Sequence, residues 1–174
     1  MPQPIEQDRE VGLWPRWRAA AGDAVVDAAL RGLYARLDSA IQERGPTCWL
    51  SGRCCNFDAF GHRLYVTGLE TAWLLMRVSD VPRPDRVDPR GPCPFQIDKM
   101  CSVHALRPLG CRVFFCEEAT QAWQHETYER FLTELRGLHD AHGLPYRYME
   151  WRTALREGLC HLCPRERSAG PPAG

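Results

Sequence analysis

The sequence predicts a mainly helical fold in which long helices flank irregular, cysteine-rich loops. Apolar residues recur at helical spacing near both ends of the chain, as the buried face of a helix requires. The chain has nine cysteines, and seven of them lie within residues 48–116. Gly and Pro interrupt the segments that carry these seven, so long helices are not expected there.

Residues 1–46 are expected to form an N-terminal helical segment. We predict a single long helix from Trp14 to Arg44, which the pair Gly45-Pro46 should end. Its buried face is formed by apolar residues that lie four or five positions apart: Ala24, Ala28, Leu33, Leu37 and Ile41.

Residues 119–164 are expected to form C-terminal helices that pack on the centre of the chain. A second long helix should run from Glu117 to His142, and Gly143 is its expected end. A further helix is predicted from about Pro145 to Gly158, and residues 165–174 are predicted to be a disordered tail. The second long helix should bury four side chains: Trp123, Phe131, Leu135 and Leu138.

Thr67 and Glu70 predict the start of a central helix. The Thr67 hydroxyl should accept a hydrogen bond from an early backbone amide, and Glu70 should reach back to the amide of the cap residue. Trp73 and Met76 follow at helical spacing and are predicted to pack in the core. The segment Val81–Pro92 is rich in Pro and charge, so it should be an exposed loop.

Composition and charge argue against several classes of protein. Lys plus Arg and Asp plus Glu both number 22, which gives no case for a nucleic-acid or anionic-membrane partner. No segment has the ~18 apolar residues of a membrane span, and the acidic N-terminus is unlike a secretory signal. We therefore expect a cytoplasmic protein, in which clustered cysteines more often bind metal or act in redox chemistry than form disulfides.

Residues 47–118 are predicted to be a metal-binding core, and the metal centre would order the loops. Thiolate sulfur is a good ligand for zinc and for iron, and a zinc ion or a four-iron cluster usually takes four cysteines. Seven thiols exceed one such site, so either some keep their protons or two metal ions share sulfurs. The candidate metal ligands are Cys48, Cys54, Cys55, Cys93, Cys101, Cys111 and Cys116.

Further side chains near the cysteines could support or extend the site. Arg107 and Arg112 are expected to offset the charge of the thiolates or to donate hydrogen bonds to sulfur. His104 is either a further ligand or a hydrogen-bonded structural histidine. Cys160 and Cys163 could complete the ligand set, bind a second ion or form a redox pair.

Several residues of this core form one longer pattern. It comprises Cys54-Cys55-Asn56-Phe57, Thr67, Glu70, Cys93-Pro94-Phe95, Cys101, His104, Arg107-Pro108 and Cys111-Arg112. The pattern resembles the YkgJ-like cysteine-cluster family, the CxxCxxCC zinc- or iron-chelating domain. The resemblance implies metal chelation and leaves the reaction open. Ser51 departs from it, because a hydroxyl stands where the family has its second cysteine, and Cys116 could replace that ligand.

Three functions fit these observations. An iron–sulfur centre with a redox or electron-transfer role is slightly favoured, because the core lacks the CxxC knuckles that structural zinc usually shows. The alternatives are a zinc-binding interaction module without catalysis and a metal-delivery protein. The chain has no nucleotide-binding, hydrolase or metalloprotease motif, so the sequence leaves open whether it is an enzyme resembling iron–sulfur oxidoreductases.

Overall fold

The computed structural model describes residues 12–49 and 51–162, and this part of the chain is mainly helical. A membrane-spanning helix is absent from the described residues. The α-helices are α2 (Leu13–Gly22), α3 (Ala24–Arg44), α4 (Gly68–Leu75), α5 (Leu109–Val113), α6 (Gln121–Ala141) and α7 (Trp151–Leu162). The 3₁₀ helices are η1 (Arg53–Cys55), η2 (Pro84–Arg86), η3 (His104–Leu106) and η4 (Glu118–Thr120). The strands are β1 (Tyr65–Thr67), β2 (Gln96–Ile97), β3 (Met100–Cys101) and β4 (Tyr148–Glu150). The predicted tail lies outside the described residues.

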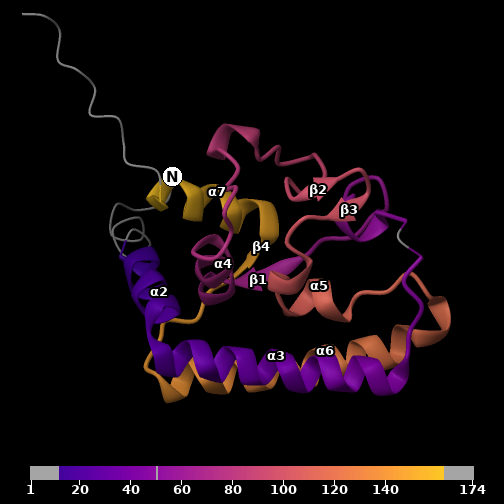
Figure 1. The fold of residues 1–174 in the computed structure, drawn as a ribbon, viewed down its shortest axis with the longest axis horizontal. Coiled ribbons are helices and arrows are strands. Elements are labelled where there is room, and N and C mark those ends of the chain that lie inside the picture. The colour runs from indigo at the N-terminus through magenta and orange to yellow at the C-terminus, as the bar shows by residue number, and fades with distance from the viewer. Residues whose placement is uncertain (1–11, 50, 163–174) are drawn as a thin grey trace, which may run out of the picture.

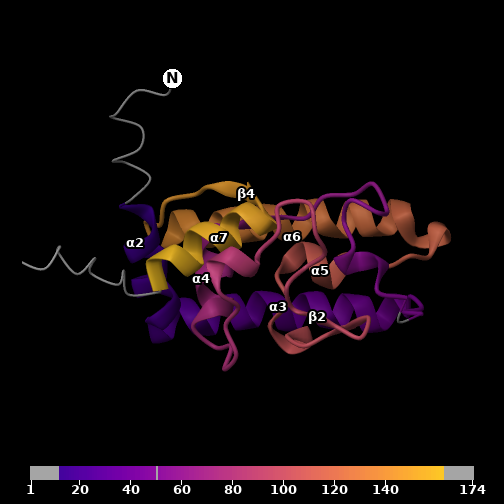
Figure 2. The same ribbon diagram turned by 90° about the horizontal axis from the view of Figure 1, so that it is seen from above.

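The two long helices, α3 and α6, lie side by side and set the length of the molecule (Figure 1, Figure 2). Helices α2, α4 and α7 pack together near one end, around the buried rings of Trp14 and Trp17. Gly68 makes this packing possible, because a Cβ at this position would lie 2.3 Å from the Trp17 ring. The β2–β3 hairpin lies toward the other end of the long helices (Figure 1).

The N-terminal helix is broken at Asp23, so the prediction of one helix from Trp14 to Arg44 is wrong. Asp23 has extended backbone with ψ 129°, and its carboxylate accepts hydrogen bonds from the amides of Val25 and Val26. It thereby caps α3 and separates it from α2. Gly45 ends α3 in the left-handed conformation with φ 63°, as the sequence predicts.

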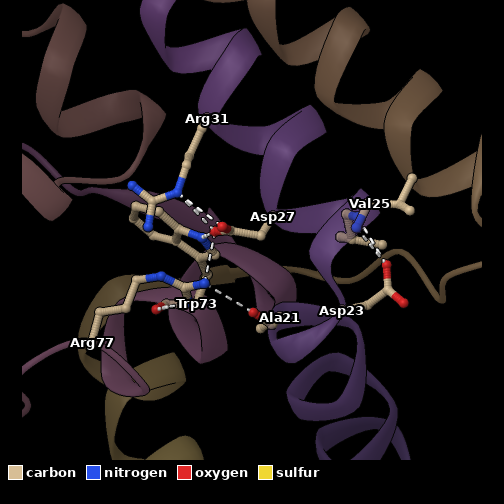
Figure 3. Close-up of polar contacts among 8 residues, drawn as sticks. Ala21, Asp23, Val25, Asp27, Arg31, Trp73 and Arg77 are labelled. Carbon is tan, nitrogen blue, oxygen red and sulfur yellow. Dashed lines mark hydrogen bonds and ion pairs between the residues drawn. The ribbon is translucent and has the colours of Figure 1, made fainter.

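Asp27, on α3, holds a cluster of cationic and aromatic side chains (Figure 3). Its carboxylate accepts hydrogen bonds from Trp73 Nε1 at 2.6 Å, Arg77 Nη2 at 2.7 Å and Arg31 Nε at 2.9 Å. The two guanidinium groups also lie over the Trp73 ring, 4.6 and 5.3 Å from its centroid. Burial raises the pKa of Asp27, but these hydrogen bonds and positive charges outweigh burial and lower the pKa. The cluster therefore ties α3 to α4.

Helix α4 begins at the predicted capping box. Thr67 Oγ1 accepts a hydrogen bond from the Glu70 amide at 3.2 Å, and Glu70 Oε2 accepts one from the Thr67 amide at 2.9 Å. Trp73 is buried, as predicted. Met76 is 43% exposed, so the prediction that it packs in the core is wrong. The helix ends at Leu75, and Met76 instead lines an open groove against α2 and α7.

The segment before α7 is a strand, so the helix predicted from Pro145 to Gly158 starts too early. Strand β4 pairs with β1 in antiparallel register, with Met149 opposite Val66. Helix α7 then begins at Trp151. The long helix predicted at Glu117–His142 is confirmed as α6 with η4 before it. Three of its four predicted core side chains are buried: Phe131, Leu135 and Leu138.

Candidate metal centre

The first cysteine loop follows α3 and carries Cys54 and Cys55 on η1. Gly52 precedes this turn in the left-handed conformation with φ 72°, and a Cβ there would lie 2.6 Å from Gln96 Nε2. The absence of a side chain lets Gln96 Nε2 donate a hydrogen bond to the Gly52 carbonyl at 2.8 Å. On the turn itself, the Sγ atoms of Cys54 and Cys55 lie 3.8 Å apart.

The second cysteine segment is joined to the first through the backbone. The Cys93 amide donates a hydrogen bond to the Cys55 carbonyl at 2.7 Å. Cys101 lies on β3, in a hairpin whose turn residues Asp98 and Lys99 both have positive φ, 48° and 66°. Two consecutive left-handed residues give the tight reversal of a two-residue hairpin. The hairpin thereby returns the chain so that Cys101 lies near the Cys55 thiol.

Helix α5 carries Cys111, and the buried carboxylate of Glu70 anchors this helix. Glu70 is 2% exposed, and burial raises its pKa. Its Oε1 atom accepts hydrogen bonds from the Leu109 amide at 2.8 Å and from the Tyr34 hydroxyl at 3.0 Å. The residue that caps α4 therefore also fixes the first residue of α5, and with it the position of Cys111.

The structure brings all seven predicted cysteine ligands to the wall of one cavity of about 130 Å³. Cys48 is exposed, whereas Cys55 and Cys93 are buried. The other four are half-buried: Cys54, Cys101, Cys111 and Cys116. Cys116 lies beside Ser51, with 3.6 Å between Cys116 Sγ and Ser51 Oγ. Cys116 therefore brings a thiol next to the Ser51 hydroxyl.

Cys55 lies at the centre of the thiol network. Its sulfur lies 3.8 Å from that of Cys54, and interactions with the thiols of Cys101, Cys54 and Cys93 raise its pKa. Interactions with the Cys55 thiol lower the pKa of Cys54 to about 6 and of Cys101 to about 7. They also lower the pKa of Cys93, whereas burial raises that of Cys111. Near neutral pH these shifts favour the thiolate, the form that binds metal, at Cys54 and Cys101.

Trp151 and Arg152, the first two residues of α7, support the cavity wall, and neither was predicted from the sequence. Trp151 Nε1 donates a hydrogen bond to Cys93 Sγ at 3.2 Å. An indole N–H can only donate, so this sulfur is the acceptor, as a thiolate or a metal-bound sulfur is. Arg152 is 2% exposed and donates to the Asp58 carboxylate at 3.2 Å and to the Gly91 carbonyl at 3.0 Å. It thereby ties both cysteine loops to α7.

Arg107 and Arg112 lie in different surroundings. Arg107 lines the cavity, and after the thiol hydrogen bonds its positive charge is a further cause of the low pKa values of Cys54 and Cys101. Arg112 is 5% exposed and donates to the Arg107 carbonyl at 2.7 Å and to the Asp38 carboxylate at 2.9 Å. Its hydrogen bonds go to oxygen, so Arg112 supports the loop that carries Arg107.

The remaining candidates lie at the edge of the cavity or away from it. His104 lines the cavity with an exposed side chain, and partial burial and the charge of Arg107 lower its pKa. Cys160 is exposed on α7 and is not part of the cavity wall. Cys163 lies outside the described residues.

The sulfur cavity has donors that suit a soft metal, although no complete site is preassembled. Within residues 12–49 and 51–162, no three His, Cys, Asp or Glu side chains have a geometry that could hold a metal ion. Tetrahedral zinc with bonds of about 2.3 Å separates its sulfur ligands by ~3.8 Å. Cys54 and Cys55 have this separation, 3.8 Å, so one edge of such a site is already formed.

Comparison with known proteins identifies no relative of this chain. No family model matches it, and neither the curated proteins nor the solved structures contain a significant match. The function is therefore argued from the side chains of the site.

Proposed function

We propose that this protein binds a metal ion through its central cysteines, as the resemblance to the YkgJ-like family implies. The observation that carries the proposal is the set of seven cysteines that line one cavity, in which the sulfurs of Cys54 and Cys55 lie 3.8 Å apart. Thiolates in a half-buried cluster repel one another and lose hydration, so the cluster is costly unless a cation compensates it. A soft divalent cation supplies that compensation. The inner ligand set is Cys54, Cys55, Cys93 and Cys101.

A single tetrahedral zinc ion is the metal that these four residues fit best. The number and type of donors match a closed structural zinc site. The 3.8 Å between the sulfurs of Cys54 and Cys55 matches one edge of its tetrahedron. Zinc binding displaces the proton of Cys55, and Arg107 on the cavity wall partly offsets the excess negative charge of four thiolates. In this form the metal cross-links the two cysteine loops.

An iron–sulfur centre with a redox role is the second candidate, and the surplus of thiols favours it. Cys48, Cys111 and Cys116 line the same cavity beyond the inner four, which one zinc ion does not need. The hydrogen bond from Trp151 to Cys93 Sγ also suits this role, because hydrogen bonds to cluster sulfurs tune the reduction potential.

Anaerobic purification without added metal, followed by elemental analysis and an absorbance spectrum, tests the two candidates. Stoichiometric zinc in a colourless protein supports the zinc site. Iron with visible absorbance that bleaches on reduction supports the redox centre. Protein that contains neither metal and takes up neither from solution contradicts the proposal as a whole.

Substitution of the inner ligands should release the metal. Cys54→Ser and Cys93→Ser are each expected to weaken binding at least tenfold, because a hydroxyl keeps its proton and is a poor ligand. The matched control is Cys160→Ser, which removes an exposed thiol that is not part of the cavity wall. Metal content per protein, measured after dialysis against a weak chelator, reports the result. Unchanged content in both inner variants would rule out this ligand set.

A further inference from the structure

A second cavity, of about 280 Å³, adjoins the sulfur cavity. Cys54, Cys111 and Phe114 line both cavities, so the two share a wall. The wall of the second cavity contains Arg63, two histidines and three tyrosines, and neither Asp nor Glu belongs to it. It therefore combines positive charge with aromatic surface.

Arg63, the cationic side chain of this cavity wall, is available to a ligand. Arg63 is exposed, and its guanidinium makes no hydrogen bond or ion pair with any residue in the described part of the chain. His125 is exposed beside the same cavity and is likewise unpaired there. A guanidinium offers two parallel N–H donors, which match the two oxygens of a carboxylate. The cavity therefore favours an anion.

The aromatic groups of the wall are arranged as stacked pairs. His62 stacks on Phe114 with 4.8 Å between the ring centroids and 15° between the planes. Tyr65 stacks on Tyr148 with 5.3 Å between the ring centroids and 22° between the planes. The hydroxyls of Tyr128 and Tyr148 are hydrogen-bonded to each other, so these two polar groups are already partnered. These rings give the wall flat apolar surface, on which an aromatic ligand can pack.

We propose that this cavity binds a small aromatic carboxylate next to the thiol cluster. A cavity of roughly 150 Å³ accommodates benzene, so about 280 Å³ suits one substituted ring. The carboxylate pairs with Arg63, and the ring lies among the stacked side chains of the wall. Because Cys54 belongs to both cavities, the bound molecule lies beside one of the sulfurs that we assign to the metal. The cavity is formed by protein groups alone, so this inference does not depend on the proposed metal.

Isothermal titration of the full chain with benzoate tests the inference. Benzoate should bind with one-to-one stoichiometry, and benzyl alcohol, which keeps the ring but lacks the charge, should bind about tenfold more weakly. Inorganic phosphate, which has charge but no ring, should also bind more weakly than benzoate. Equal affinity for benzoate and benzyl alcohol, phosphate binding as tight as benzoate, or no benzoate binding would each overturn the proposal.

Three variants locate the binding site. Arg63→Gln should weaken benzoate binding about tenfold, and Tyr65→Leu should weaken it several-fold. Both side chains are exposed, so neither change should prevent folding, which circular dichroism verifies. Arg86→Gln is the matched control, because Arg86 is an exposed arginine of η2 that does not line the cavity. Unchanged benzoate affinity in the first two variants would contradict this location.

Discussion

The helices and the cysteine loops depend to different degrees on long regular elements and on single polar contacts. We call α2, α3, α4, α6 and α7 the helical frame, and residues 47–61 with 91–116 the cysteine lobe. The frame buries large apolar side chains completely, with Trp17, Leu30 and Leu155 at 0% exposure. The described part of the lobe consists of short turns, two-residue strands and one five-residue helix. It also buries apolar side chains such as Phe57 and Leu109, and polar contacts to the frame help to position its turns. Because its elements are so short, the lobe should depend more than the frame on each polar contact.

The largest effect is expected from a cavity in the frame. Trp17→Ala removes a fully buried ring and its hydrogen bond to the Pro145 carbonyl, so it should lower the free energy of unfolding by about 3–5 kcal/mol. Trp49→Ala is the matched change in the lobe, where the ring is 59% exposed, and it should have an effect below about 0.5 kcal/mol. Urea unfolding measures both. Equal losses of unfolding free energy in the two variants would show that the frame does not depend on apolar burial.

A smaller but more specific effect is expected from Arg152, the contact between frame and lobe. Arg152→Gln leaves the Glu150 and Asp58 carboxylates without their cation and should cost about 2 kcal/mol. It should also loosen the lobe, so that Cys54 and Cys55 react faster with a thiol reagent under native conditions. Arg83→Gln removes an exposed ion pair with Asp85 and should change neither quantity. Unchanged thiol reactivity in Arg152→Gln would contradict the proposed dependence of the lobe on polar contacts.

The smallest effect is expected from Asp27, a polar contact within the frame. Asp27→Asn should cost about 1 kcal/mol near pH 7, because the cluster is partly exposed and screened by solvent. The pKa of Asp27 is lowered in the folded protein, so its ionised form stabilises the fold above the ordinary carboxyl pKa. That contribution is lost as the pH falls through the lowered value. The difference between the two proteins should therefore shrink between about pH 5 and pH 2, and a constant difference would contradict the assignment.

The sequence could predict those features that depend on neighbouring residues. The capping box of Thr67 and the end of α3 at Gly45 need only a few consecutive residues, and both are confirmed. The break at Asp23 also has a local signal, the pair Gly22-Asp23, which the prediction of one helix from Trp14 to Arg44 does not use. Strand β4 could not be predicted in this way, since its partner β1 lies more than eighty residues earlier.

The candidate site also has features that depend on neighbouring residues and features that depend on distant ones. Cysteine chemistry and spacing predicted a thiol cluster, and the seven thiols do line one cavity. The hydrogen bond from Trp151 to Cys93 has no local signature, because it depends on how α7 packs against the second cysteine loop. The same is true of Arg152, whose partners Asp58 and Gly91 come from two separate loops.

The hydrogen bond between Trp151 and Cys93 has a consequence for the synthesis of the protein. The two residues lie 58 positions apart in the chain. Synthesis proceeds from the N-terminus at about 5–20 residues per second, so the Cys93 thiol precedes its indole donor by roughly 3–12 s. During that interval the nascent chain meets dissolved ions and oxidants before α7 exists to cover it. Which ion first reaches the growing polypeptide thus becomes a question of timing as well as of affinity.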